Sequence, residues 1–218
     1  ASVTVHRLLD ADLVLISPRS KSSISMSGFP KRRLIQALAQ KEVLSVAPVN
    51  LNYLLWRNPE NLKTRSILAL GFNPEDSLLI DEEFKAKAES LKNPGRVLFD
   101  TLSRPEFGPI EEWYRNGRNV ETEVAGKRVK VEGLVELGPS FGADGNLITS
   151  RETFLRLLSG NPKGSIEIGL IKLSDKSDHK FIKNILNKSL PNDVRVLTKK
   201  EFIDFEKNYW RDSTAIGF

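Results

Sequence analysis

Few residues in this chain are of the types that perform acid–base, nucleophilic or metal chemistry. The sequence contains two histidines, His6 and His179, and no cysteine. Three-histidine metal sites, thiol nucleophiles and thiolate metal sites are therefore excluded. Asp178 directly precedes His179 and could suggest part of a catalytic triad. Neighbouring residues on a helix point about 100° apart, however, so the pair indicates the solvated first turn of a helix.

Two acidic clusters place carboxylates close together in the sequence. They are the Asp-Glu-Glu of residues 81–83 and the pair Glu111 and Glu112. A carboxylate pair could do general acid–base work, which keeps a soluble periplasmic hydrolase open as an alternative function. Carboxylates are also common at helix starts, where they meet the positive end of the helix dipole. Neither Asp81 nor Asp144 opens a calcium-loop spacing, and no glycine-rich phosphate loop occurs. We therefore predict no catalytic residue, no metal ligand and no cofactor.

Two aromatic pairs lie where they could contact a partner or a membrane. Trp113 and Tyr114 fall in an irregular stretch, where they either anchor a protein or lipid partner or pack beneath their own loop. With Phe141, which lies in a turn-rich loop, they are our candidates for partner contact. Tyr209 and Trp210 precede an apolar end of the sequence, and they indicate either core packing of a last helix or an aromatic pair beside a membrane span.

The composition is that of an ordinary globular domain. Of 218 residues, 33 are basic and 28 are acidic, giving a net charge of +5, and 39% are hydrophobic. No apolar run approaches the roughly 20 residues that cross a bilayer. The charges are mixed, without a basic stripe interleaved with aromatics, so we predict no nucleic-acid partner. A basic module that binds anionic lipid or nucleic acid stays open as an alternative. The lack of cysteine suits an extracytoplasmic compartment.

Hydrophobic periodicity predicts two strand–helix–strand halves far apart in the sequence. The expected elements are strands at residues 12–17, 43–56, 165–173 and 194–197, and helices at residues 30–40 and 178–190. Two such halves can form one sheet with both helices on one face, which is the split βαβ arrangement of a ferredoxin-like domain. We therefore predict an α+β fold, with a frame at residues 1–76 and 161–218 and an inserted α/β subdomain at residues 77–160.

The clearest local motif inside the insertion is a β-hairpin. Residues 119–124 and 127–137 read as its strands, with Ala125 and Gly126 as a two-residue loop. That loop places Glu123 opposite Arg128, and Glu121 opposite Lys130. The same pattern predicts that Val129, Val131, Val135 and Leu137 share a buried face.

Helix starts are predicted from capping residues. Thr149 with Glu152, and Thr198 with Glu201, have the spacing of a capping box, in which each side chain bonds the other residue's backbone N–H. The second box begins a last helix. Asp81 is expected to cap a short helix whose apolar face carries Phe84, Ala88 and Leu91.

Five stretches carry a resemblance to a known family. They are DLVLISPRSK at residues 12–21, RRLIQAL at 32–38, LGFNP at 70–74, VEGLVELGPSFGADGNLITS at 131–150 and YWRDSTAIGF at 209–218. As a set they resemble the extracytoplasmic domain of MacB-type ABC transporter permeases, and they are most similar to the DevC-like glycolipid-exporter branch.

The resemblance implies a periplasmic domain between the first and second of four membrane helices. It implies a porter-like subdomain that holds both ends, with a sabre-like subdomain inserted into it. Asp10, Tyr209, Trp210 and Asp212 would be the membrane-proximal connections, with residues 1–10 extending the first membrane helix and the second beginning at Phe218.

The partners that the resemblance implies are a second permease copy, a separate cytosolic ATPase and a periplasmic adaptor of the membrane-fusion type. An outer-membrane channel would complete the exporter, and glycolipid would be the cargo. The domain would then be no enzyme: ATP hydrolysis below the membrane would move it mechanically.

Overall fold

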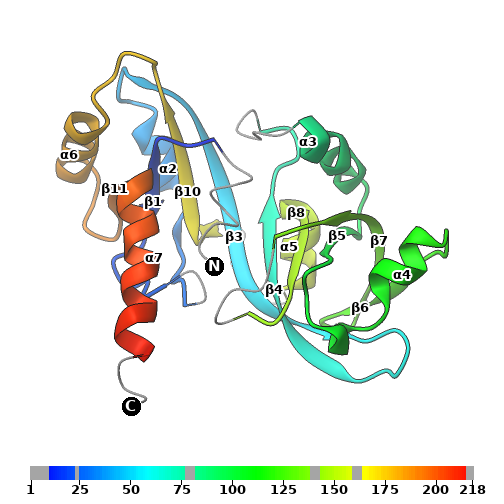
Figure 1. Ribbon diagram of the computed structural model, residues 1–218. Coiled ribbons are helices and arrows are strands. Elements are labelled where there is room, and N and C mark those ends of the chain that lie inside the picture. Colours follow the sequence, from blue (N-terminus) through cyan, green and yellow to red (C-terminus); the bar gives the residue numbers. More distant parts are fainter. Residues whose placement is uncertain (1–9, 23–24, 77–81, 138–142, 159–163, 215–218) are drawn as a thin grey trace. The chain divides into compact units, whose positions relative to one another are not determined.

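The computed structural model describes residues 10–22, 25–76, 82–137, 143–158 and 164–214 (Figure 1). The chain forms two compact units: an inserted unit, Leu51–Asn161, and a frame unit, made of Ser2–Asn50 and Pro162–Phe218. The first boundary therefore lies after residue 50, whereas the sequence pattern places it after residue 76. The reason is that strand β4 pairs with β8 of the insertion. That these units are porter-like and sabre-like stays a prediction.

The frame unit is built on four main strands in the order β11-β1-β10-β3. All three pairings between them are antiparallel. If β1, β3, β10 and β11 are numbered 1 to 4 in chain order, their order across the sheet is 4-1-3-2. This order confirms the predicted split βαβ fold. The elements of this unit are β1 (Leu13–Ile16), β2 (Phe29–Pro30), α2 (Arg32–Ala37), the first part of β3 (Val43–Arg57), β9 (Ser165–Ile166), β10 (Ile168–Leu173), α6 (His179–Ser189), β11 (Arg195–Thr198) and α7 (Lys199–Thr214).

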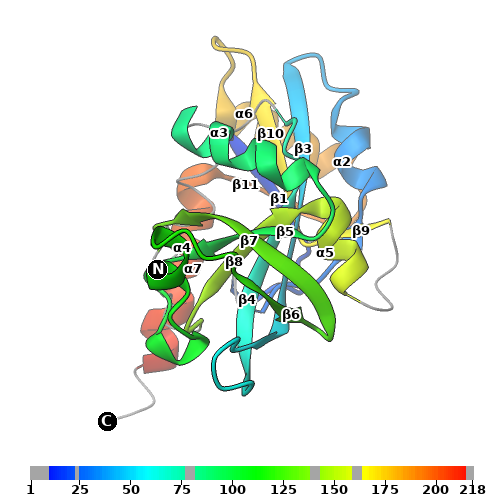
Figure 2. The same ribbon diagram turned by 90° about the vertical axis from the view of Figure 1, so that its right-hand side faces the viewer.

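Helices α2 and α6 cover the same face of this sheet, as predicted (Figures 1 and 2). Leu34 of α2 and Ile182 of α6 belong to one buried cluster with Leu13 and Leu15 of β1. Because strand side chains alternate, Val14 and its neighbours in register point to the other face, where α7 contacts β11 and β1. The core of the frame unit is thus a sheet covered by helices on both faces.

The inserted unit is a strongly curved sheet with helices around it. Its strand order is β3-β4-β8-β5-β7-β6, and β6 pairs back to β3 at Val124 and Trp56, so the six strands form a closed circuit. Trp56 is fully buried and donates from Nε1 to the Phe107 carbonyl at 2.9 Å. The elements are the second part of β3, β4 (Thr64–Phe72), α3 (Glu82–Glu89), η1 (Ser90–Lys92), β5 (Arg96–Asp100), η2 (Pro105–Phe107), α4 (Ile110–Arg115), β6 (Glu121–Val124), β7 (Lys127–Val135), β8 (Asn146–Ser150) and α5 (Arg151–Leu157).

The hairpin β6–β7 has the predicted register. Glu121 lies opposite Lys130 and Glu123 opposite Arg128. Ala125 and Gly126 have φ angles of 50° and 72°, as a type I′ turn requires. The ion pairs nevertheless run to other partners: Glu121 contacts Arg128 diagonally at 3.1 Å, and Glu123 contacts Arg57 of β3 at 3.0 Å. Pairing of β6 with β3 brings Arg57 next to Glu123, so this ion pair could not be predicted from the hairpin sequence alone.

Two of the local predictions that are wrong fail because a strand pairing takes precedence. Thr149 does not cap α5, because it belongs to β8 and its hydroxyl donates to the Arg96 carbonyl at 2.7 Å. Ser150 caps the helix instead, accepting from the Thr153 N–H at 3.2 Å. The predicted strand at residues 165–173 is two strands, since Ser165 and Ile166 pair with β2 and only the remainder pairs with β1 and β3.

Other local predictions are confirmed. Thr198 and Glu201 form the expected capping box at the start of α7. Phe84 and Ala88 of α3 are buried, as is Leu91 directly after that helix, whereas Asp81 lies outside the described residues. Val129, Val131 and Val135 are buried along one face of β7, but Leu137 lies beyond the end of that strand and is only half-buried. In the described part of the chain, no helix is both long and apolar enough to cross a membrane.

Gly71 gives a direct test of packing inside the inserted unit. A Cβ atom there would lie 2.6 Å from the Cβ of Phe154, which is fully buried on α5. Gly71→Ala is therefore expected to lower the free energy of unfolding by about 1–3 kcal/mol, the usual cost of overpacking a core. Urea unfolding measures the change. Gly164→Ala is the control, because its added methyl meets nothing within 4 Å; equal stability of the two variants would contradict the packing.

Candidate coupling site at the two chain connections

The segment that precedes β1 and the helix α7 that follows β11 meet at one end of the sheet of the frame unit. β1 and β11 are antiparallel, with Leu13 opposite Thr198. Just beyond this pair, the Lys199 N–H donates to the Asp12 carbonyl at 3.2 Å. The segment before β1 and the start of helix α7 therefore lie side by side, although they are near opposite ends of the sequence.

A cluster of charged residues fixes the incoming segment to β10. Lys172 Nζ contacts Asp10 Oδ2 at 2.8 Å and Asp12 Oδ2 at 3.6 Å. The hydrogen bond to Asp10, which outweighs partial burial, raises the pKa of Lys172. Asp12 also accepts from the Leu173 N–H at 2.8 Å, and its other oxygen lies 3.8 Å from His179 Nε2. Asp10, which the family resemblance implies is a membrane-proximal connection, is the outer member of this cluster.

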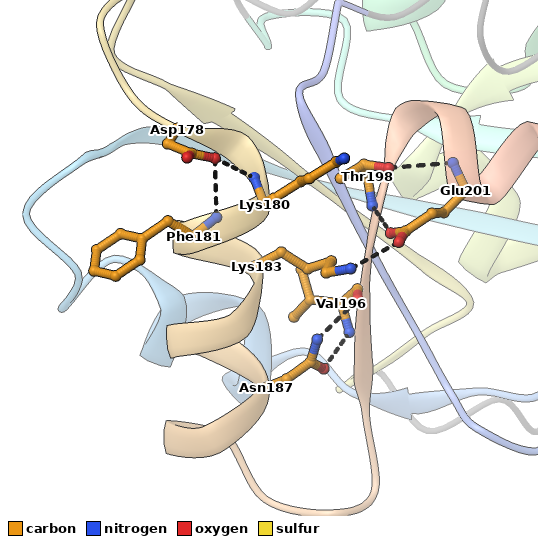
Figure 3. Close-up of polar contacts among 8 residues, drawn as sticks. All are labelled: Asp178, Lys180, Phe181, Lys183, Asn187, Val196, Thr198 and Glu201. Atoms are coloured by element: carbon orange, nitrogen blue, oxygen red, sulfur yellow. Dashed lines mark hydrogen bonds and ion pairs between the residues drawn. The ribbon is translucent and has the colours of Figure 1, made fainter.

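A second set of contacts fixes the start of α7 (Figure 3). The Thr198 N–H donates to Glu201 Oε2 at 2.8 Å, and the Glu201 N–H donates back to Thr198 Oγ1 at 3.2 Å. Lys183 of α6 approaches the same carboxylate at 2.7 Å. Burial alone would raise the pKa of Glu201, but the hydrogen bonds from Lys183 and Thr198 and the lysine charge outweigh burial and lower it. Glu201 is therefore held ionised between α6 and α7.

Helix α6 is itself tied to the neighbouring strand. Its N-cap residue Asp178 accepts from the N–H groups of Lys180 and Phe181 at 2.9 and 3.1 Å, which confirms the predicted helix start (Figure 3). Two residues before its end, Asn187 bonds both the N–H and the carbonyl of Val196 on β11. The helix is thus fixed to the sheet through main-chain as well as apolar contacts.

The first two turns of α7 pack against β11. Phe202 is buried and stacks on Phe205 with ring centroids 6.1 Å apart. The guanidinium of Arg195 lies 4.9 Å from the centroid of the Phe205 ring. The helical backbone continues through Tyr209, Trp210 and Asp212 to Thr214, and the side chains of those three lie outside the described residues.

Sequence reasoning identified Asp10, Thr198 and Glu201 but missed Asp12, Lys172, Lys183 and Asn187. No local motif marks the missed residues. Their partners become apparent only once β10 and β11 are placed on either side of β1. A charged or amide side chain at a predicted strand or helix position is otherwise read as solvated surface.

The residues predicted to contact a partner lie in the inserted unit. Trp113 and Tyr114 are on helix α4 and not in the predicted irregular stretch, because burial of Ile110 fixes the first turn of that helix in the core. Tyr114 is half-buried, packs against the core and donates from its hydroxyl to the Glu132 carbonyl at 2.8 Å. Trp113 is also half-buried, and the guanidinium of Arg118 lies 3.5 Å from its ring centroid. Phe141 lies outside the described residues. The structure is therefore compatible with both roles of the aromatic pair. Its inner side packs against the core, and its outer side is accessible to a partner.

The acidic clusters show no arrangement for catalysis in the part that is described. Glu111 forms an ion pair with Arg115 one turn away on α4, at 2.8 Å. The side chains of residues 81–83 are outside the described set. Across the described ranges, no group of three or more histidine, aspartate or glutamate side chains is arranged to hold a metal ion.

The ion pair between Lys183 and Glu201 predicts a defined pH dependence of stability. Because the folded pKa of Glu201 is lowered, the stabilisation is present above the unfolded value of about 4.3 and is lost as pH falls through the folded pKa. Glu201→Gln should cost about 0.5–1 kcal/mol at pH 7, since the pair is partly exposed, and nothing near pH 2. Chemical unfolding between pH 2 and 7 measures this. In a Lys183→Gln background the same substitution should cost less, because only the hydrogen bonds from Thr198 then favour the ionised form; an undiminished loss there would refute the pair as the main source.

Comparison with known proteins places this geometry in a known fold. No family model matches the chain, and no curated protein matches it. Among solved structures, the periplasmic region of MacB from Actinobacillus actinomycetemcomitans is similar with a TM-score of 0.57 and 13% identity, over 94% of this chain and 96% of that one. The extracellular domain of YknZ, a noncanonic ABC-type transporter from Gram-positive bacteria, is similar with a TM-score of 0.51 and 11% identity, over 86% of this chain and 99% of that one. The chain thus has the fold of the periplasmic region of MacB.

Proposed function

We propose that this chain is the periplasmic domain of an ABC-type exporter permease and acts as a mechanical relay, with no catalytic role. The observation that carries the proposal is the meeting of the two chain connections at Asp12 and Lys199. A domain held by two adjacent connections follows any relative movement of the segments to which they lead. The likeness of the fold to the periplasmic region of MacB supports the same role.

The contacts around these connections suit the transmission of force. α7 is a continuous helix of 16 residues, about 24 Å long, and a helix of that length resists bending better than an extended chain. Its first turn is fixed to α6 through Glu201, and the incoming segment is fixed to β10 through Lys172. A displacement of either connection is therefore delivered to the whole sheet of the frame unit.

The finer assignment rests on the sequence resemblance. We propose a MacB-type permease of the DevC-like branch, with glycolipid as cargo, that works with a second permease copy and a separate cytosolic ATPase. A periplasmic adaptor of the membrane-fusion type would receive the cargo and pass it to an outer-membrane channel. The frame unit would be the porter-like subdomain and the inserted unit the sabre-like one, with Asp10, Tyr209, Trp210 and Asp212 nearest the membrane.

The relay is tested by breaking α7 beyond its anchored turns. Asn208 is exposed on this helix, six residues after Phe202. In the full-length permease, Asn208→Pro removes a helical hydrogen bond and kinks the helix, at roughly 3 kcal/mol of helix stability. We expect ATP-driven export in cells to be largely lost. Asn208→Ala keeps the helix and should export normally. Normal export by the proline variant, with its helix shown to be kinked, would contradict the relay.

Partner contact by the inserted unit is tested at Trp113. If its accessible side anchors the adaptor, Trp113→Ala should weaken adaptor binding about 30-fold, which corresponds to a hot-spot loss of about 2 kcal/mol. Isothermal titration calorimetry with the purified adaptor measures the affinity. Leu102→Ala is the control, because Leu102 is an exposed apolar residue of the same unit. Unchanged affinity for the tryptophan variant, with its unfolding midpoint preserved, would rule out this anchor.

A further inference from the structure

β11 is the edge strand of the frame unit. Among the described residues, β1 is its single strand neighbour, so one side of β11 has no strand beside it. An edge strand normally presents a row of N–H and C=O groups that can pair with another chain. Another chain could therefore add a strand to the free side of β11, unless the structure blocks its backbone groups.

The register identifies which groups of β11 point to the free side. In an antiparallel pair, residues bonded to the partner strand alternate with residues whose backbone groups point away from it. Lys199 bonds Asp12, so the alternation assigns Leu197 and Arg195 to bonding with β1 as well. Val196 and Thr198 are the residues between them, and their N–H and C=O groups point outward.

The outward N–H groups have partners from side chains of the same unit (Figure 3). Val196 donates to Asn187 Oδ1 at 2.8 Å, and the Val196 carbonyl accepts from Asn187 Nδ2 at 3.0 Å. Asn187 thus makes the two bonds that a neighbouring strand would make. The Thr198 N–H donates to Glu201 Oε2, which Lys183 holds in place. Just before the strand, the Val194 N–H donates to the Pro191 carbonyl at 3.3 Å.

We propose that Asn187 and Glu201 protect this edge against strand addition, and that the strand they exclude is β11 of a second copy of this chain. The edge is self-complementary. Val196 and Thr198 are two residues apart, which is the repeat of hydrogen-bonded pairs in an antiparallel ladder. Val196 of one copy would therefore pair with Thr198 of the other, and the reverse, with Leu197 facing Leu197 at the centre. The protected edge keeps the copies from associating through this face, whatever the transport role.

The choice of residue at position 187 supports this inference. Asn187 is exposed near the end of α6, where most polar residues would be accommodated. Asparagine is a weaker helix former than lysine, glutamate or glutamine, so helix stability does not explain its presence. Its side-chain amide is one of the two that carry a donor and an acceptor together, as the main chain of Val196 requires.

The test removes the protection and measures self-association. On a Glu201→Ala chain, which leaves the Thr198 N–H open, Asn187→Ala should shift the sedimentation behaviour to a larger, concentration-dependent species. Asn184→Ala is the matched control, since Asn184 is an exposed asparagine about one turn earlier on the same helix. Because the chain has no cysteine, Leu197→Cys reports the contact directly. On the same Glu201→Ala chain, it should form a disulfide-linked dimer readily with Asn187→Ala and poorly with Asn184→Ala. Equal sedimentation and equal cross-linking in the two backgrounds would overturn the proposal.

A second measurement starts from the wild-type chain, where its first outcome depends on no substitution. Amide hydrogen exchange of the wild-type chain, read by NMR, should show Val196 and Thr198 protected although they lie at a sheet edge. In Asn187→Ala at low concentration, Val196 should exchange roughly five- to tenfold faster, the factor that one hydrogen bond contributes, with Thr198 unchanged. Exchange of the wild-type Val196 amide at the rate of an unprotected amide would show that the edge is open.

Discussion

The antiparallel pairing of β1 with β11 is the constraint on which the rest of the frame unit depends. It brings Asp12 and Lys199, near opposite ends of the sequence, within one hydrogen bond of each other. It also sets which face of β11 packs against α6 and which against α7. A shift of one residue would exchange those faces and expose the buried set, because strand side chains alternate. Apolar burial on both faces therefore specifies this register strongly.

The polar contacts around that pairing have a different role from the core. Partly exposed ion pairs such as that between Lys172 and Asp10 contribute little each, typically below 1 kcal/mol. The fully buried side chains of β1, by contrast, each contribute about 1.5–3 kcal/mol. Burial thus holds the sheet together, whereas the polar contacts fix the directions in which the two connections leave it. Direction matters for a domain that we propose to transmit movement.

Some side chains serve two purposes at this site. Glu201 caps α7, pairs with Lys183 and satisfies an outward N–H of β11. Asn187 joins α6 to β11 and occupies the main-chain groups of the strand edge. A substitution at either residue therefore affects helix anchorage and edge protection together. Those effects can be separated only by comparing stability with self-association.

The sequence by itself determined the elements whose signals are local. Periodicity located the strand–helix–strand halves, Thr198 with Glu201 marked the start of α7, and the two-residue loop of Ala125 and Gly126 set the hairpin register. Only the tertiary structure decided what depends on strand order. Thr149 belongs to a β-ladder and does not cap a helix, and residues 165–173 are divided between two sheets. Lys172, Lys183 and Asn187 find their partners only in the folded sheet. The physical reason is that these contacts join segments far apart in the chain, so their energy appears only after the sheet has brought the segments together.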